Sequence, residues 1–428
     1  MHVEEITRIK EFRQIRKEVR GSEKYLLVGV DVGKEKHYAF YGTANGKTLE
    51  RRLVFWNNFS GIEMLMDHAN ALKEGNGLEK IVYGMEPTSN YHKPLAEYLI
   101  RCGCNVVLVS GVSVARNREL LDGRWDKHDG KDSANAADLI SQGKCQYYDY
   151  PSLEIRDLRN MLSLKRMLRK QEHRMRVRIR NNVIAQHFPE FDSQFAKGCS
   201  ESLAVVKWCI RPRDINLLEY EQFEEMVAPR VRTRAQADRI KSIWLDANES
   251  IGCEAGEGLQ FGAKLMVEEL QHIRDSIKAL DEQIENICRE FPEYHYLLSI
   301  PGFGPDISSK VLGAIGNPLR FDNGKQVLKL VGYDLSASRT GMTSDKAVPV
   351  ISKRGNAHLR YALYQAALIA STRNKYFKRY YTNQLRGRER ERGIKTKMKV
   401  KLAAKMLIIA WTLMKNKEPF DPSYLNIE

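Results

Sequence analysis

Four acidic residues in the first third of the chain are placed where carboxylates could act together. Asp31 ends an apolar run in GVDVG, and Glu86 ends a second one in YGMEPT. Asp129 and Asp132 lie three residues apart in KHDGKDSANAADLI, at an expected helix start, so they share one helix face. Crowded carboxylates repel unless cations neutralise them, and oxygen-only ligands suit Mg²⁺, with Mn²⁺ as the alternative. Paired metal ions of this kind stabilise the attacking and leaving oxygens in phosphodiester chemistry.

Each of these acids, taken alone, also has a structural explanation. Asp31 is a typical turn former, Glu86 precedes a proline, and Asp129 and Asp132 are typical helix N-cap residues. GVDVGKEKHYAF also suits the phosphate-binding hairpin of a sugar kinase or actin-like ATPase, but neither a second Gly-rich loop nor an adenosine-binding stretch is present later in the sequence. The combination of four acids in a strand-rich, basic protein favours a catalytic site.

The elements around these acids alternate as in an α/β domain. Strands are expected at 25–31, 37–42, 49–55, 81–86 and 105–110, and helices at 59–73, 92–101 and 132–142. Strand ends carry functional side chains in α/β sheets, and both Asp31 and Glu86 end strands. This arrangement predicts that the four acids meet at one edge of a sheet.

The composition narrows the class of protein. The 428 residues carry a net charge of +15 and a pI near 9.3, which points to nucleic acid as the partner. The N-terminus lacks a secretory signal, and the most apolar late stretch, Met406 to Met414, is too short to span a membrane. Seven cysteines without a CxxC pair argue against a disulfide scaffold or zinc ribbon and favour a reducing cytoplasm.

Positive charge is concentrated in two segments. Residues 156–180 contain ten Lys or Arg against two acids, and residues 373–405 contain thirteen against two. Such one-sided charge is typical of a polyanion-binding surface. The candidate nucleic-acid contacts in the first segment are Arg166, Arg169, Lys170 and Arg174.

Two further patterns predict helical architecture. Residues 264–288 carry an a/d heptad seam, which predicts a coiled coil that either joins two chains, the favoured alternative, or forms an internal hairpin. The seam consists of Met266, Leu270, Ile273, Ile277, Leu280, Ile284 and Ile287. Residues 297–317 resemble a helix-hairpin-helix, in which glycines and helix N-terminal amides approach a phosphate.

On these motifs, the sequence resembles the bridge-RNA-guided DEDD transposases of insertion sequences, the IS one-ten family. Residues 25–188 resemble their RuvC-like domain of RNase H fold, with Asp31, Glu86, Asp129 and Asp132 as the acidic quartet. Residues 264–415 resemble the remainder, including the C-terminal transposase domain. The stretches that carry this second resemblance are IPGFGPDISSKVLGAIGNPLRF and VISKRGNAHLRYALYQAA.

The resemblance implies an α/β RNase H-like N-terminal domain, a coiled-coil helix and a mostly α C-terminal domain. The expected parts are an N-terminal extension (1–24), the RuvC-like domain (25–150), a basic helical segment (151–190), an insertion of unclear fold (191–262), the coiled coil (263–290) and the C-terminal transposase domain (291–428).

The resemblance also implies an activity and partners. It implies a DNA recombinase of a mobile element that uses Mg²⁺, a hydroxyl nucleophile and a bridge RNA as guide. The protein would form a dimer or a dimer of dimers without contacting a membrane, and it would work in the prokaryotic cytoplasm at the nucleoid. Lys353, Arg354 and Arg360 of the ISKRGNxxLR motif would contact backbone phosphates.

The nucleophile departs from the family pattern. The family's serine stands before a glycine upstream of ISKRG, whereas the residue before Gly341 here is Thr340. Three explanations stay open: Thr340 is the nucleophile, the nucleophile is Ser336, Ser338 or Ser344, or this copy is catalytically impaired. The alternative functions are a metal-dependent RuvC-like nuclease or junction resolvase, which would use water, and a decayed or domesticated nucleic-acid-binding protein.

Overall fold

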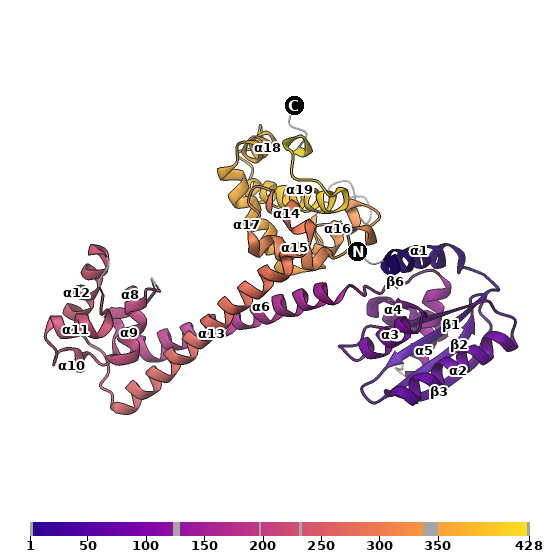
Figure 1. The fold of residues 1–428 in the computed structure, drawn as a ribbon, viewed down its shortest axis with the longest axis horizontal. Helices are drawn as coiled ribbons and strands as arrows, with labels where there is room; N and C mark the ends of the chain where they lie inside the picture. Colours follow the sequence, from indigo (N-terminus) through magenta and orange to yellow (C-terminus); the bar gives the residue numbers. More distant parts are fainter. Residues whose placement is uncertain (1–2, 123–128, 197, 231–232, 337–349, 426–428) are drawn as a thin grey trace. The chain divides into compact units, whose positions relative to one another are not determined.

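The computed structural model describes residues 3–122, 129–196, 198–230, 233–336 and 350–425 (Figure 1). The chain divides into two compact units, unit 1 (Met1–Ser152) and unit 2 (Leu153–Glu428). Across the described ranges, none of the helices combines the length and apolar character that crossing a membrane requires. All seven cysteines are free thiols.

Unit 1 is built on a six-stranded mixed sheet with the strand order β3-β2-β1-β4-β5-β6. Its strands are β1 (Tyr25–Val32), β2 (Lys36–Thr43), β3 (Thr48–Trp56), β4 (Lys80–Met85), β5 (Asn105–Leu108) and β6 (Gln146–Tyr147). The first three strands form an antiparallel meander, whereas β1, β4 and β5 run parallel to one another, and β6 is antiparallel to β5. The parallel strands place the carboxyl ends of β1 and β4 side by side.

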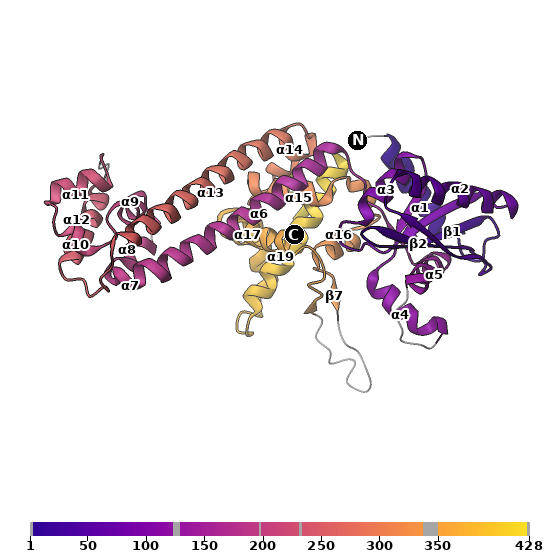
Figure 2. The ribbon, with the colours of Figure 1, turned by 90° about the horizontal axis from the view of Figure 1, so that it is seen from below.

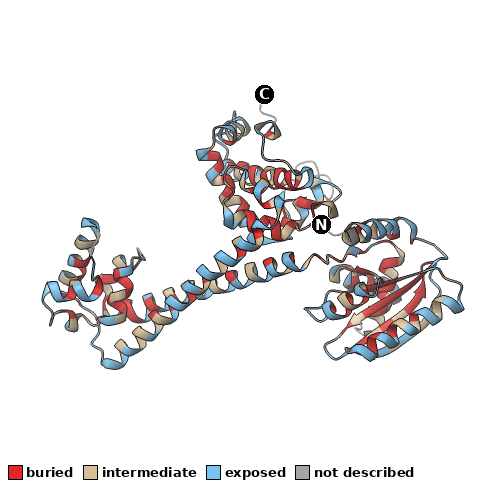
Figure 3. Cartoon of the chain, viewed as in Figure 1, coloured by how far each residue is buried: buried red, intermediate tan, exposed pale blue. Residues whose placement is uncertain are grey.

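Helices cover both faces of this sheet. They are α1 (Val3–Glu18), α2 (Phe59–Gly75), α3 (His92–Arg101), α4 (Gly111–Asp122) and α5 (Asp129–Ser141). Alternate residues of β1 point to opposite faces of the sheet. Leu26 and Val28 pack with α2 and α3, whereas Tyr25 and Leu27 pack with α1, α4 and α5. Buried residues accordingly follow the strands in Figure 3. By the same alternation, Asp31 belongs to the α5 face.

Unit 2 contains a long antiparallel helical hairpin of α6 (Leu153–Ile179) and α13 (Glu257–Arg289). The two helices lie side by side in both views (Figures 1 and 2). Lys165 Nζ lies 2.5 Å from Asp281 Oδ1, and Glu172 Oε1 lies 3.1 Å from Arg274 Nε. Residues later in α6 thus pair with residues earlier in α13, as they do in antiparallel helices. The heptad seam therefore packs within the chain, and the pairing of two copies stays a prediction.

A helical insertion lies between the two arms of this hairpin in the sequence. It consists of η1 (Arg180–Ile184), α7 (Ala185–His187), η2 (Pro189–Phe191), α8 (Asp192–Ala196), α9 (Ser200–Trp208), α10 (Pro212–Ile215), α11 (Tyr220–Val227) and α12 (Arg234–Asn248). It has a hydrophobic core of its own, to which α6 and α13 contribute their adjoining ends. Its two ends touch, since the Cys253 amide donates to the Gln186 carbonyl oxygen at 2.8 Å.

The rest of unit 2 is a helical domain with a short two-stranded ribbon. Its elements are α14 (Pro292–Leu298), α15 (Pro305–Ile315), η3 (Pro318–Arg320), α16 (Gly324–Val331), β7 (Leu335–Ser336), β8 (Val350–Ile351), α17 (Ala357–Arg373), α18 (Lys375–Leu385), α19 (Ile394–Asn416) and η5 (Pro422–Leu425). The core is centred on α17 and α19 and includes the near ends of α6 and α13. Most of unit 2 is therefore helical.

Candidate active site

The position of Asp31 is fixed by the contact between β1 and α5. Gly29, two residues earlier on the same face, leaves no room for a side chain: a Cβ there would collide with the Ser133 carbonyl oxygen and lie 2.7 Å from the Ala137 nitrogen. The α5 backbone therefore rests directly on β1. Asp132 immediately precedes Ser133, so this contact brings the start of α5 to the part of β1 that carries Asp31.

Glu86 reaches the same edge of the sheet from β4. The parallel register pairs Gly29 with Gly84 and Val30 with Met85, and one further step places Glu86 beside Asp31. Gly84 also faces α5, because a Cβ there would collide with the Ile140 side chain. A Cβ on Gly111 would strike the Glu86 carboxylate, so Glu86 packs against the first residue of α4.

Asp132 is buried and already carries a cationic partner. The Nε and Nη2 atoms of Arg118 on α4 donate to Asp132 Oδ1 at 2.9 and 2.6 Å. The side chain of Asp132 is 7% exposed and that of Arg118 is 19% exposed, so the pair is largely removed from solvent. Asp129 is the first residue of α5, and its side chain is outside the described part of the structure.

The donor set fits a hard divalent cation in its chemistry. Asp31, Glu86 and Asp132 offer only oxygen atoms, which is the ligand type that Mg²⁺ prefers. A positive group already lies beside the buried Asp132 carboxylate, because Arg118 forms an ion pair with it. Within the described ranges, however, no three acidic, histidine or cysteine side chains lie close enough together to hold a metal ion. The metal site therefore remains a prediction.

The candidate nucleophiles lie on the segment that joins β7 to β8 in unit 2. Ser336 ends β7, while Ser338, Thr340 and Ser344 fall outside the described residues. The base of the ribbon is held by Ser352, whose amide donates to the Asp334 carbonyl oxygen at 2.8 Å and whose Oγ lies 2.6 Å from Asp334 Oδ1. The ribbon gives this segment two fixed ends.

The ISKRG loop packs tightly on the end of α16. A Cβ on Gly355 would lie 2.6 Å from the Leu330 carbonyl oxygen, so only glycine fits there. Arg360 Nη1 donates to the carbonyl oxygens of Val331 at 2.7 Å and Lys353 at 3.3 Å. Arg360 thus braces the loop, whereas Lys353 and Arg354 are exposed and available to phosphates. Phosphate contact by any of the three stays a prediction.

The basic side chains of α6 are of two kinds: one is buried in ion pairs, and others are exposed to solvent. Lys165 is buried and pairs with Asp281 and with Asp306 of α15, at 2.5 and 2.6 Å. The candidate nucleic-acid contacts on this helix are exposed, and they are Arg166, Arg169, Lys170 and Arg174. The phosphate site that the sequence predicts at the start of α15 stays a prediction; Asp306, in the first turn of this helix, pairs with Lys165 and Lys310.

Two residues of these surfaces were missed in the sequence, Arg118 and His358. His358 is the second residue of α17 and lies among cations. Partial desolvation of its ring, together with Arg166, Lys170 and Lys310, lowers its pKa. No sequence signal could have found either residue, because the role of Arg118 depends on how α4 packs against α5 and that of His358 on cations from other helices.

Comparison with known proteins gives these features a context. A family model described as a transposase, of the DEDD type, matches residues 28–189, and a model of the transposase IS116/IS110/IS902 family matches residues 294–382. These matches cover the mixed sheet with α6 and much of the C-terminal helical domain. The DEDD transposase match identifies the fold of the first domain as RNase H-like.

Individual relatives agree with these matches. Pilin gene-inverting proteins of Moraxella lacunata and Moraxella bovis are 30% identical over 158 residues, which is 36% of this chain and 47% of each relative. The chain thus spans about half the length of these two relatives. A 43.6 kDa protein of insertion element IS110 from Streptomyces coelicolor is 23% identical over 405 residues, 91% of this chain and 94% of the relative.

The IS116 protein of Streptomyces clavuligerus, of 44.8 kDa, shows the same full-length similarity, with 23% identity over 422 residues. The similarity therefore runs from the sheet through the hairpin to the C-terminal helices. In both matched regions the chain is therefore similar to the transposases of the IS116/IS110/IS902 family.

Proposed function

We propose that this protein is the recombinase of an insertion sequence, which cuts DNA strands and rejoins them at a new site. One observation carries the proposal: Gly29 and Gly84 seat α5 on the sheet so that Asp31, Glu86 and Asp132 come to the same edge. Two relatives are named for inverting a pilin gene, which is a DNA rearrangement. The family similarity and the site thus point to the same class of reaction.

The acids would act on a phosphate. Asp31, Glu86, Asp129 and Asp132 would hold Mg²⁺, which when bound supplies positive charge to the phosphodiester oxygens. Arg118 orients Asp132 in the folded chain through two hydrogen bonds to Oδ1. The basic residues of α6 and of the ISKRG loop would bind the DNA and RNA backbones through counterion release.

A side-chain hydroxyl would attack the phosphorus. Its oxygen forms a new bond to phosphorus while the P–O bond of the DNA strand breaks, and the released strand takes up the proton as a free hydroxyl. The number of phosphodiester bonds is unchanged, so the linkage can be reversed on another DNA end. Thr340 is the first candidate for this hydroxyl, and Ser336, Ser338 and Ser344 are the alternatives.

A guide RNA and several copies of the chain would complete the complex. Base pairing with a bridge RNA would choose the donor and target DNA, because the charged surfaces described above read backbones rather than bases. We propose a dimer or a dimer of dimers, which works at the nucleoid in the prokaryotic cytoplasm. The exposed cations of α6 are the first candidates for RNA contact.

The test uses supercoiled donor and target DNA, Mg²⁺ and the RNA encoded beside the gene. Protein attached covalently to DNA is measured after denaturation for the wild type, Asp31→Asn and Thr340→Ala. Asp67→Asn, an exposed acid on α2, is the matched control and should retain the adduct. We expect the adduct to disappear in both site variants.

Other outcomes identify the alternatives. An adduct that survives Thr340→Ala but not Asp31→Asn moves the nucleophile to one of the serines. DNA cleavage without any adduct supports a nuclease or junction resolvase that uses water. DNA binding without cleavage or adduct in the wild type contradicts the recombinase and supports a decayed copy.

A further inference from the structure

A cavity of about 640 Å³ lies within unit 1, away from the carboxylates. It is lined by α1, by the segment from the end of α3 to the start of β5, and by Tyr147 and residues 150–152. β5 starts at Asn105, the edge where the parallel strands begin, whereas Asp31 and Glu86 lie where β1 and β4 end. The cavity and the candidate active site therefore occupy opposite edges of the sheet, and the volume falls within the roughly 300–1,000 Å³ of small-ligand sites.

One wall of the cavity is formed by a guanidinium group and aromatic rings. Arg8 Cζ lies 5.3 Å from the ring centre of Tyr147 and 5.5 Å from that of Tyr150. Arg8 Nη2 donates to the Tyr148 carbonyl oxygen at 3.0 Å, and Phe12 packs on Tyr147 with ring centres 5.5 Å apart. Flat surfaces of this kind stack on nucleobases, with little regard to sequence.

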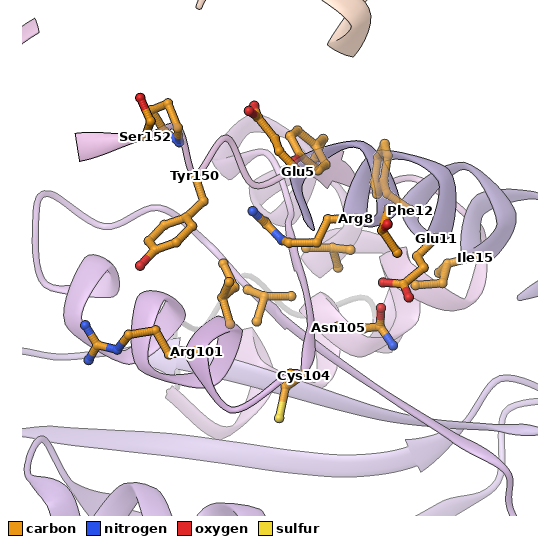
Figure 4. Close-up of a pocket in the computed structure, with 17 residues that line it drawn as sticks. Glu5, Arg8, Glu11, Phe12, Ile15, Arg101, Cys104, Asn105, Tyr150 and Ser152 are labelled. Carbon is orange, nitrogen blue, oxygen red and sulfur yellow. The ribbon is translucent and has the colours of Figure 1, made fainter. Parts of the chain in front are cut away.

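Polar groups of different kinds surround this wall (Figure 4). Glu11 of α1 and Asn105 of β5 both line the cavity, and exposed Arg101 lies at the end of α3. Guanine presents adjacent N–H donors on its Watson–Crick edge, which suit a carboxylate, and an acceptor oxygen, which suits a side-chain amide. The other bases do not offer two neighbouring donors. An arginine at the rim suits a phosphate.

We propose that this cavity binds an unpaired guanine nucleotide of a single-stranded nucleic acid. The base stacks on the wall formed by Arg8 and the tyrosines, its edge meets Glu11, and its phosphate meets Arg101. Part of this site lies outside the matched transposase region, which starts at residue 28. The proposal does not depend on strand cleavage, so Asp31→Asn should bind guanine as the wild type does.

The experiment measures fluorescence anisotropy of labelled single strands with the full-length protein. Pairs of oligonucleotides differ only in a central guanine or adenine, as RNA and as DNA, at moderate salt to suppress backbone binding. The wild type should favour the guanine strand about tenfold, which is the lower limit for one hydrogen bond to a charged group; stacking should add affinity for both strands. Glu11→Gln, which removes the charged acceptor, should abolish the preference.

Matched variants separate this site from general charge and from folding. Glu23→Gln removes the same charge at an exposed position outside the cavity and should keep the preference. Tyr150→Leu should weaken all single strands, because it removes a stacking surface. An unchanged circular dichroism spectrum shows that a variant is folded. Glu11→Gln should pass this check, because the Glu11 side chain is exposed.

The two backbones identify the source of the nucleotide. If guanine strands bind more tightly than adenine strands in both RNA and DNA, the site recognises the base and the phosphate. If they do so in RNA alone, the same site also contacts the ribose. Guanosine monophosphate should compete with the labelled strand. Equal binding of guanine and adenine strands, or a preference that survives Glu11→Gln, overturns the proposal.

Discussion

The ion pair between Arg118 and Asp132 should contribute strongly to the stability of unit 1. Arg118→Met removes the charge, keeps most of the apolar stem and leaves the Asp132 carboxylate buried without its partner. The side chain of Asp132 is only 7% exposed, so water cannot replace the lost cation. Breaking a buried pair by removing one partner costs about 3–5 kcal/mol, and the partial exposure of Arg118 places this pair near 3 kcal/mol.

The double variant tests whether the cost comes from the pair. Asp132→Asn removes the negative charge, so Arg118→Met combined with Asp132→Asn no longer buries an uncompensated carboxylate. We therefore expect the double variant to be less destabilised than the sum of the single variants, by about 2 kcal/mol. Lys24→Met is the matched control, because Lys24 pairs with Glu79 at 2.9 Å but both side chains are more than half exposed. It should leave stability nearly unchanged.

Native-state hydrogen exchange suits this measurement, because the chain has two units that need not unfold together. Amides of β1 and α5 should exchange roughly a hundredfold faster in Arg118→Met than in the wild type, which corresponds to about 3 kcal/mol. Peptides from unit 2 serve as an internal reference. If the single and double variants add within about 0.5 kcal/mol, the two residues are not coupled and the reasoning is refuted.

The same geometry supports three further predictions. Gly29→Ala should lower the free energy of unfolding by about 3 kcal/mol and reduce strand transfer, because α5 must move away from β1; Gly75→Ala, which meets no atoms, should be neutral or slightly stabilising in urea titrations. Arg354→Gln should reduce the slope of log K against log salt for DNA binding by about one unit, without loss of stability. Arg360→Gln should lower the melting temperature, because it removes the hydrogen bonds that hold the ISKRG loop. Desolvation and three neighbouring cations lower the pKa of His358, and bound phosphates, which neutralise those cations, should raise it. DNA binding should therefore tighten as the pH falls from neutrality, and less so in His358→Gln; equal pH profiles for the two proteins would contradict this.

The sheet of unit 1 could be predicted because its signals are local. The apolar run before Asp31 and the second run before Glu86 each end at the residue that later marks the edge of the sheet. The strands expected at 25–31 and 81–86 are β1 and β4. The helix after β5 was not predicted, because α4 has weak amphipathic character, yet this helix carries Arg118. The partner of Asp132 depends on how two helices pack, which periodicity does not report.

The helical seam at 264–288 illustrates a different limit. Its spacing correctly predicts a long helix with one apolar face, which is α13. The spacing does not say which surface covers that face, and in this chain α6 does so. Residues 191–262 could not be interpreted from the sequence, because short helices divide their apolar residues into runs too brief to show a period.

The two ends of the insertion lie next to each other, as in an inserted domain. His187 Nδ1 lies 3.0 Å from the Cys253 carbonyl oxygen, beside the backbone bond between Cys253 and Gln186. The chain thus leaves and re-enters the hairpin at almost one point, as a domain insertion does. The helices inside the insertion could therefore change in number and length while α6 and α13 keep their paths, provided that the adjoining ends of both helices stay covered. We expect relatives to differ in size mainly here.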